Sequence, residues 1–132
     1  MADRGIVVAV FLLTHSEPVR FDPGRVADIY MELGEDRAEQ LLSDAVEDVA
    51  VALSRLSKLG PHSSLPEIAD IAEGLSTRAE HCGMIDLARV AGDVRGAAAQ
   101  LDLAALGATM ARLARVGDRS LAAIWGPANA SL

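Results

Sequence analysis

The chain has 132 residues, of which 51% are hydrophobic and 23% charged, so it holds enough apolar material for a single folded domain. Its formal net charge of −7 argues against nucleic acids and anionic membrane surfaces as partners, because both are bound through clustered lysine and arginine. Only 3% of the residues are aromatic, which predicts an aliphatic core and favours helices over sheets.

The first 21 residues are predicted to form an N-terminal apolar extension. Its longest apolar run, Ile6 to Leu13, is far shorter than the roughly 20 residues of a membrane-spanning helix. Asp3 and the lack of a small-x-small cleavage site argue against a secretory signal, so we expect a cytoplasmic protein. We expect residues 6–13 to pack on the core or to form a flexible extension. Left exposed, this run would instead favour dimerisation.

Two helices are predicted next. Asp22 is placed to cap a short helix that begins at Pro23 and ends before Gly34. A long amphipathic helix is expected from about Glu35 to Leu59, and the Gly-Pro pair after it would end it. The apolar stripe of the long helix consists of Ala38, Leu41, Leu42, Ala45, Val49, Leu53 and Leu56.

Ser64 and Glu67 have the spacing of a capping box, which predicts the start of a third helix. This helix is expected to run to about Cys82, and Gly83 would end it. The fourth helix carries Leu87, Val90, Ala91, Val94, Ala98 and Leu101. Asp102 would cap the fifth, whose stripe is Leu106, Met110, Leu113, Leu121 and Ile124. Gly126-Pro127 is expected to end that helix, leaving residues 128–132 as a flexible tail. These patterns predict an all-α protein: an up-down four-helix bundle over residues 22–127, with the short helix packed on one end.

The sequence carries none of the common catalytic motifs, such as a glycine-rich phosphate loop, Gly-x-Ser-x-Gly or His-Glu-x-x-His. His15, His62 and His81 share no metal-ligand spacing, so we expect no metal and no cofactor. Cys82 falls on the apolar stripe of the third helix and is predicted to be an inert buried side chain. We therefore expect a protein that is not an enzyme.

The third helix and the break after it carry small and apolar residues at a defined spacing: Ala72, Leu75, Ala79, Gly83, Met84 and Leu87. This segment resembles the central motif of histidine-containing phosphotransfer (HPt) domains. That motif runs Ala-His-x-Leu-Lys-Gly-x-Ala, then three residues, a glycine, an apolar residue and a leucine three further on. The resemblance extends over roughly residues 33–125 and implies the HPt four-helix bundle.

The chain departs from the motif at its chemical positions. The family's phosphoacceptor histidine aligns with Glu73, its lysine with Ser76 and its glycine with Thr77. A carboxylate cannot form the phosphoramidate intermediate of that family. The resemblance therefore implies the fold without the phosphotransfer activity. It suggests a protein of two-component phosphorelay signalling that binds a response-regulator receiver domain or a histidine kinase.

Helical geometry places Glu73 on the solvent side. At roughly 100° per residue it lies about 160° around the helix from Leu75, which faces the core. The predicted docking surface comprises Asp70, Glu73, Ser76, Thr77 and Glu80. The receiver domains that HPt proteins usually bind have an acidic phosphorylation pocket. Like charges would therefore disfavour the contact between such a pocket and this acidic face of the helix. Glu73 then either mimics a phosphorylated histidine toward a basic or metal-bearing pocket, or is a solvated carboxylate on a face that docks no receiver.

Other interpretations remain open. Arg112, Arg115 and Arg119 share one face of the fifth helix, where they would pair with acids of the second helix or bind an acidic partner. The protein could instead be a structural bundle that oligomerises, for example as a homodimer to which residues 6–13 contribute. A third interpretation is an active phosphotransfer protein that uses His81, although His81 lacks a neighbouring lysine.

Overall fold

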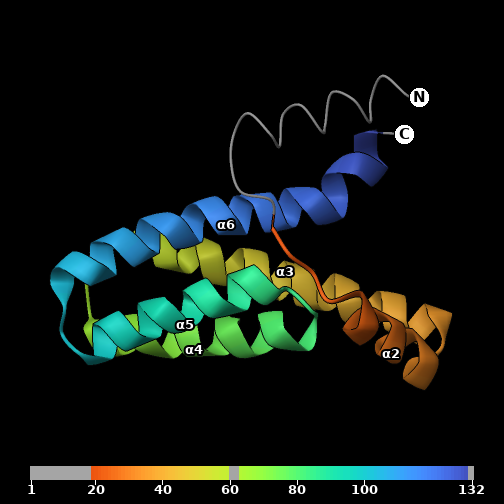
Figure 1. Ribbon diagram of the computed structural model, residues 1–132, viewed down its shortest axis with the longest axis horizontal. Helices are drawn as coiled ribbons and strands as arrows, with labels where there is room; N and C mark the ends of the chain where they lie inside the picture. Colours follow the sequence, from red (N-terminus) through yellow and green to blue (C-terminus); the bar gives the residue numbers. More distant parts are fainter. Residues whose placement is uncertain (1–18, 60–62, 131–132) are drawn as a thin grey trace.

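The computed structural model describes residues 19–59 and 63–130, and this part of the chain is all-helical, as predicted. It contains five helices, which Figure 1 labels in chain order. They are α2 (Pro23–Leu33), α3 (Glu35–Leu59), α4 (Leu65–His81), α5 (Ile85–Ala99) and α6 (Leu103–Ala130). The predicted run Ile6–Leu13 lies outside the described residues.

The helices begin where their capping residues predict. The Asp22 carboxylate accepts hydrogen bonds from the backbone N–H of Gly24 (3.0 Å) and of Arg25 (3.2 Å). Ser64 Oγ accepts from the N–H of Glu67 (3.4 Å), and Asp102 Oδ1 accepts from the N–H of Ala105 (3.0 Å). Each cap satisfies backbone donors that have no partner inside the helix, which is why these local patterns predict helix starts well.

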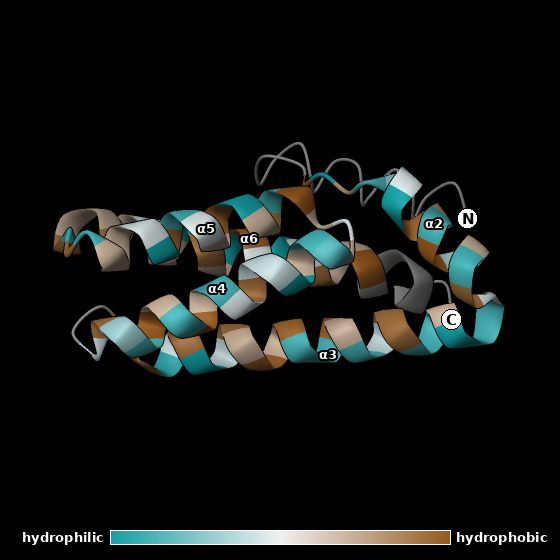
Figure 2. Cartoon of the chain, turned by 90° about the horizontal axis from the view of Figure 1, so that it is seen from below, coloured by the Kyte–Doolittle hydropathy of each residue, from teal (hydrophilic) through white to brown (hydrophobic). Residues whose placement is uncertain are grey.

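Helices α3, α4, α5 and α6 each run antiparallel to the next, and α2 lies at a steep angle beside the start of α3 (Figure 1). Helix α4 packs on α3 and most extensively on α5, α5 packs on α6, and α6 returns to α3 over a shorter stretch. Figure 2 shows hydrophobic and hydrophilic residues alternating along α3 at the spacing of helical turns. The core that these faces enclose is aliphatic, and its largest fully buried members are Val49, Ile68, Met84, Leu87, Val90, Val94, Leu106 and Leu113.

Three positions differ from the sequence prediction. Leu41 is 45% exposed and is not part of the buried stripe of α3. Leu101 is not part of the fourth helix: it follows the end of α5, has a φ of 58° and is 70% exposed. Gly126-Pro127 does not end the last helix, which continues to Ala130. A proline removes only one hydrogen bond of a helix and can bend it instead of ending it.

Residues 19–21, here called the N-terminal strap, belong to the folded unit although the sequence assigned them to the extension. Phe21 forms an isolated antiparallel bridge with Met84. The N–H of Asp22 donates to the carbonyl of Gly83 (2.7 Å), and the N–H of Ile85 donates to the carbonyl of Arg20 (3.1 Å). Val19 and Phe21 are partly buried against the core. The strap is thus held on the turn between α4 and α5.

Candidate functional site

The candidate site is the exposed side of α4, and it depends on which residues α4 turns inward. The structural positions of the predicted motif all face the core: Ala72, Leu75, Ala79, Met84 and Leu87 are each at most 2% exposed. With these residues fixed in the core, the helical repeat carries the intervening residues to the opposite face. The packing of α4 therefore determines what it offers to solvent.

The turn after α4 requires the glycine of the motif. Gly83 has a φ of 76°, a left-handed conformation that L side chains rarely adopt. The N–H of Met84 donates to the carbonyl of Ala79 (2.8 Å) and that of Gly83 to the carbonyl of Glu80 (3.1 Å), which is the Schellman pattern of helix ends. A Cβ at position 83 would also lie 2.9 Å from the carbonyl oxygen of Asp22. Both the backbone angle and the carbonyl of Asp22 therefore disfavour a side chain here.

The predicted surface residues lie at the outward positions that helical spacing gives them, with one exception. Asp70, Glu73, Thr77 and Glu80 are exposed along α4, and we call these four residues the α4 ridge. Ser76 is half-buried, and its Oγ donates a hydrogen bond to the carbonyl of Ala88 on α5 (2.9 Å). Ser76 therefore ties α4 to α5, and its hydroxyl is engaged within the protein.

The α4 ridge is flanked by one arginine of α5 and one of α4 itself. Glu73 Oε1 lies 3.7 Å from Nε of Arg95 on α5. On the other flank, Arg78 of α4 forms an ion pair with Asp48 of α3. Sequence reasoning treated this face as purely acidic because it considered α4 alone. The fold brings compensating positive charge beside it, and this weakens the expected like-charge repulsion.

A groove between α3 and α4 borders the ridge on the side away from α5. It has a volume of about 490 Å³. Its floor includes Ile71, Gly74 and Leu75, and charged side chains stand around it, with Arg55 NH2 and Glu67 Oε1 3.9 Å apart. Asp70 of the ridge also lines this groove. A partner that docks on α4 would thus meet a convex row of polar side chains beside a shallow depression.

The other sequence candidates lie elsewhere. His81 is the last residue of α4 and is exposed, and its backbone carbonyl accepts a hydrogen bond from Arg25 Nε (2.9 Å). Arg112, Arg115 and Arg119 lie on the flank of α6 opposite the residues that face α3.

Cys82 is 7% exposed, as expected for a core residue. Burial raises the pKa of its thiol, and the nearby charges of Arg78 and Arg25 offset this in part. A raised pKa leaves little thiolate at neutral pH, which agrees with an inert side chain.

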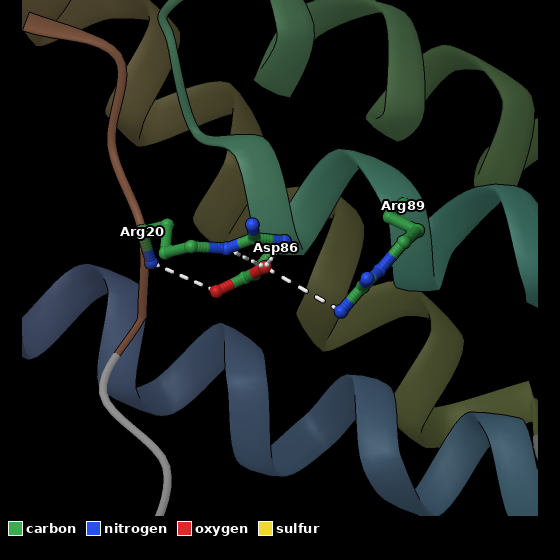
Figure 3. A network of polar contacts seen from close by, with 3 residues as sticks. All are labelled: Arg20, Asp86 and Arg89. Atoms are coloured by element: carbon green, nitrogen blue, oxygen red, sulfur yellow. Dashed lines mark hydrogen bonds and ion pairs between the residues drawn. The ribbon is translucent and has the colours of Figure 1, made fainter.

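Sequence reasoning missed a polar network that joins the strap to α5. Figure 3 shows Arg20 of the strap and Arg89 of α5 converging on the carboxylate of Asp86. Arg20 donates to Oδ1 from Nε (2.9 Å) and NH2 (2.8 Å), and its backbone N–H donates to Oδ2 (2.8 Å). NH2 of Arg89 lies 3.5 Å from Oδ1. No local pattern could reveal this contact, because Arg20 and Asp86 are 66 residues apart.

The environment of Asp86 favours its charged form. Its side chain is only 12% exposed. Burial by itself would raise the pKa of the carboxyl, but the hydrogen bonds from Arg20 and the charges of Arg20 and Arg89 outweigh this and lower it. The network therefore clamps the strap to the first turn of α5, close to the turn that carries Gly83.

Within residues 19–59 and 63–130, no group of three or more His, Cys, Asp or Glu side chains is arranged to hold a metal ion. None of the helices in this part of the chain combines the length and apolar character needed to cross a membrane. Comparisons with protein-family models, with curated proteins and with solved structures find no match.

Proposed function

We propose that the protein is an HPt-like component of two-component signalling, built as an up-down bundle of α3 to α6. It docks a receiver domain or a histidine kinase through the α4 ridge and does not itself carry a phosphoryl group. The ridge, with Glu73 near its middle, takes the place of the surface that presents the phosphoacceptor histidine in the HPt family.

One observation carries the proposal: α4 separates the motif into a buried half and an exposed half. The spaced small and apolar positions lie in the core, Gly83 has the left-handed conformation that its turn requires, and Glu73 lies outside. Together these features support kinship with a family whose motif makes the same division.

The side chains at the chemical positions argue against phosphate transfer. Glu73 offers a carboxylate, which cannot form a phosphoramidate. The Ser76 hydroxyl is already donated to the carbonyl of Ala88 and supplies no positive charge for a phosphoryl group. Arg95 stands beside Glu73, with its Nε 3.7 Å from the carboxylate oxygen Oε1, and forms an ion pair with it. The ridge is therefore suited to binding a partner whose pocket is basic or bears a metal ion.

Restoring the missing chemistry tests this kinship. The triple variant Glu73→His/Ser76→Lys/Thr77→Gly would be incubated with receiver domains that have been phosphorylated by radiolabelled acetyl phosphate. We expect a base-stable, acid-labile label on the variant and none on the unmodified protein. The matched control, Glu80→His with the same Ser76→Lys and Thr77→Gly changes, puts the imidazole two turns away and should remain unlabelled.

Two results would contradict the proposal. One is a triple variant that keeps the helical circular dichroism of the unmodified protein but takes no label from any receiver. The other is label on the unmodified protein that disappears on His81→Gln, which would identify an active phosphotransfer protein instead.

Docking is tested separately by charge reversal on the ridge. Glu73→Lys should weaken binding to a receiver domain by about tenfold or more, which corresponds to roughly 1.4 kcal/mol. Glu47→Lys, the same change on the exposed face of α3, should leave binding unchanged. Titration calorimetry measures both. Tighter binding by Glu73→Lys would show that the carboxylate obstructs docking and would refute its role as a contact.

A further inference from the structure

A second groove lies between α3 and α6 and has a volume of about 580 Å³. Its rims carry small side chains, namely Ala50, Ser54 and Ser57 on α3 and Gly107, Ala111 and Ala114 on α6. Leu53, Leu113 and Leu121 are among its apolar lining residues. Among the described residues that line it, Asp118 alone is charged. This composition suits an uncharged apolar segment with bulky side chains, which would fit between the small residues of the rims.

Beside the groove, α3 and α6 come close where Leu53 meets Gly117. Leu53 packs so tightly over Gly117 that a Cβ there would lie 2.6 Å from Leu53 Cδ1. Lining residues span 50–57 of α3 and 107–121 of α6, or roughly 10 Å and 20 Å of helix at about 1.5 Å per residue. The groove is therefore long enough for a short stretch of chain.

We infer that residues 6–13 of the same chain cover the α3–α6 groove. This run, Ile-Val-Val-Ala-Val-Phe-Leu-Leu, has no charge and consists of bulky apolar side chains apart from one alanine. Eight residues span about 12 Å as a helix, which fits within the groove, or about 26 Å as a strand, which is somewhat longer than the groove. The inference is independent of the proposed signalling role.

The position of the strap favours this occupant over a separate molecule. Val19 packs against the core, Asp86 holds Arg20, and Figures 1 and 3 show the strap passing alongside α6. The stretch from Leu13 to Val19 can reach about 20 Å when extended, just enough for the roughly 16–19 Å half-circumference of the helix that it would have to pass around. A segment tethered this closely has an effective concentration in the millimolar range, far above that of a second copy in dilute solution.

Disulfide trapping in the full-length chain tests the inference. In a Cys82→Ala background, Ala114→Cys places a thiol on the rim of the groove, and a second cysteine is introduced at each of positions 6–13 in turn. After mild oxidation at low micromolar concentration, we expect an intramolecular disulfide at a subset of positions, seen as a faster monomer band on non-reducing gels. The matched control is Ala108→Cys, an exposed site on another flank of α6. There we expect the yield of intramolecular disulfide to be at least about tenfold lower than with Ala114→Cys.

Every other outcome overturns the inference. Disulfide-linked dimers whose yield rises with protein concentration would mean that the groove takes a second copy of the chain. Equal yields at positions 114 and 108, or no product at either, would mean that residues 6–13 do not occupy the groove. Circular dichroism of each variant confirms that the helices are retained.

Discussion

The turn after α4 gives the sharpest test of the structure, because Gly83→Ala should destabilise the protein by about 2 kcal/mol. A left-handed backbone costs an alanine roughly 1–2 kcal/mol. The new Cβ would approach the carbonyl oxygen of Asp22 at 2.9 Å, so the 2.7 Å hydrogen bond from Asp22 to Gly83 must loosen. Weakening that bond costs about another 1 kcal/mol. Alanine also lowers the conformational entropy of the unfolded chain, which stabilises the folded protein by about 0.4–1 kcal/mol and offsets part of the loss.

Gly74→Ala is the matched control, since Gly74 lies within α4 and has nothing within 4 Å of its missing Cβ. This change should raise the free energy of unfolding by about 0.5–1 kcal/mol. Urea denaturation followed by circular dichroism measures both variants, and the two midpoints should move in opposite directions. If Gly83→Ala left the midpoint unchanged or raised it, the left-handed turn and its contact with Asp22 would both be wrong.

Two further predictions concern buried groups. Asp86→Asn should lower the free energy of unfolding at pH 7 by about 2 kcal/mol, whereas Asp93→Asn, on the exposed side of the same helix, should not change it. The folded-state pKa of Asp86 is lowered, so the stability that the unmodified protein gains over Asp86→Asn should be fully present above about pH 4. This gain should shrink as the pH falls through the folded-state pKa of Asp86. A gain that grew on acidification would contradict the clamp. Cys82 should react with a disulfide reagent on the order of 100-fold more slowly in the folded protein than in guanidinium, because it is buried and its pKa is raised. Fast labelling of the native protein would place that thiol at the surface.

The sequence predicts local features of this fold well and long-range ones poorly. Helix starts at Asp22, Ser64 and Asp102 are visible because a cap and the N–H groups that it satisfies lie within three residues of each other. The outward position of Glu73 follows from the helical repeat alone. The contact between Arg20 and Asp86 depends on how distant segments are placed, and no periodicity encodes it.

The two turns that flank α5 show where the limit lies. Gly83 and Leu101 occupy the same position in the same hydrogen-bond pattern, since the N–H of Asp102 donates to the carbonyl of Ala97 (3.0 Å) as that of Met84 does to Ala79. Glycine identifies the first turn from the sequence, because it adopts positive φ at little cost. The second turn cannot be identified from the sequence, because the apolar side chain of Leu101 continues the apolar stripe of α5 and so predicts a longer helix.

The candidate site depends on these distant contacts as much as on its own residues. Glu73 meets Arg95, and Ser76 meets the carbonyl of Ala88, only because α5 lies along α4 in one register. That register is set by the tight turn at Gly83, and the strap bonds both to this turn and, through Arg20, to the first turn of α5. A partner that binds the α4 ridge would therefore meet side chains already held in place. It follows that loosening the strap, although it touches no ridge residue, should weaken docking as well as stability.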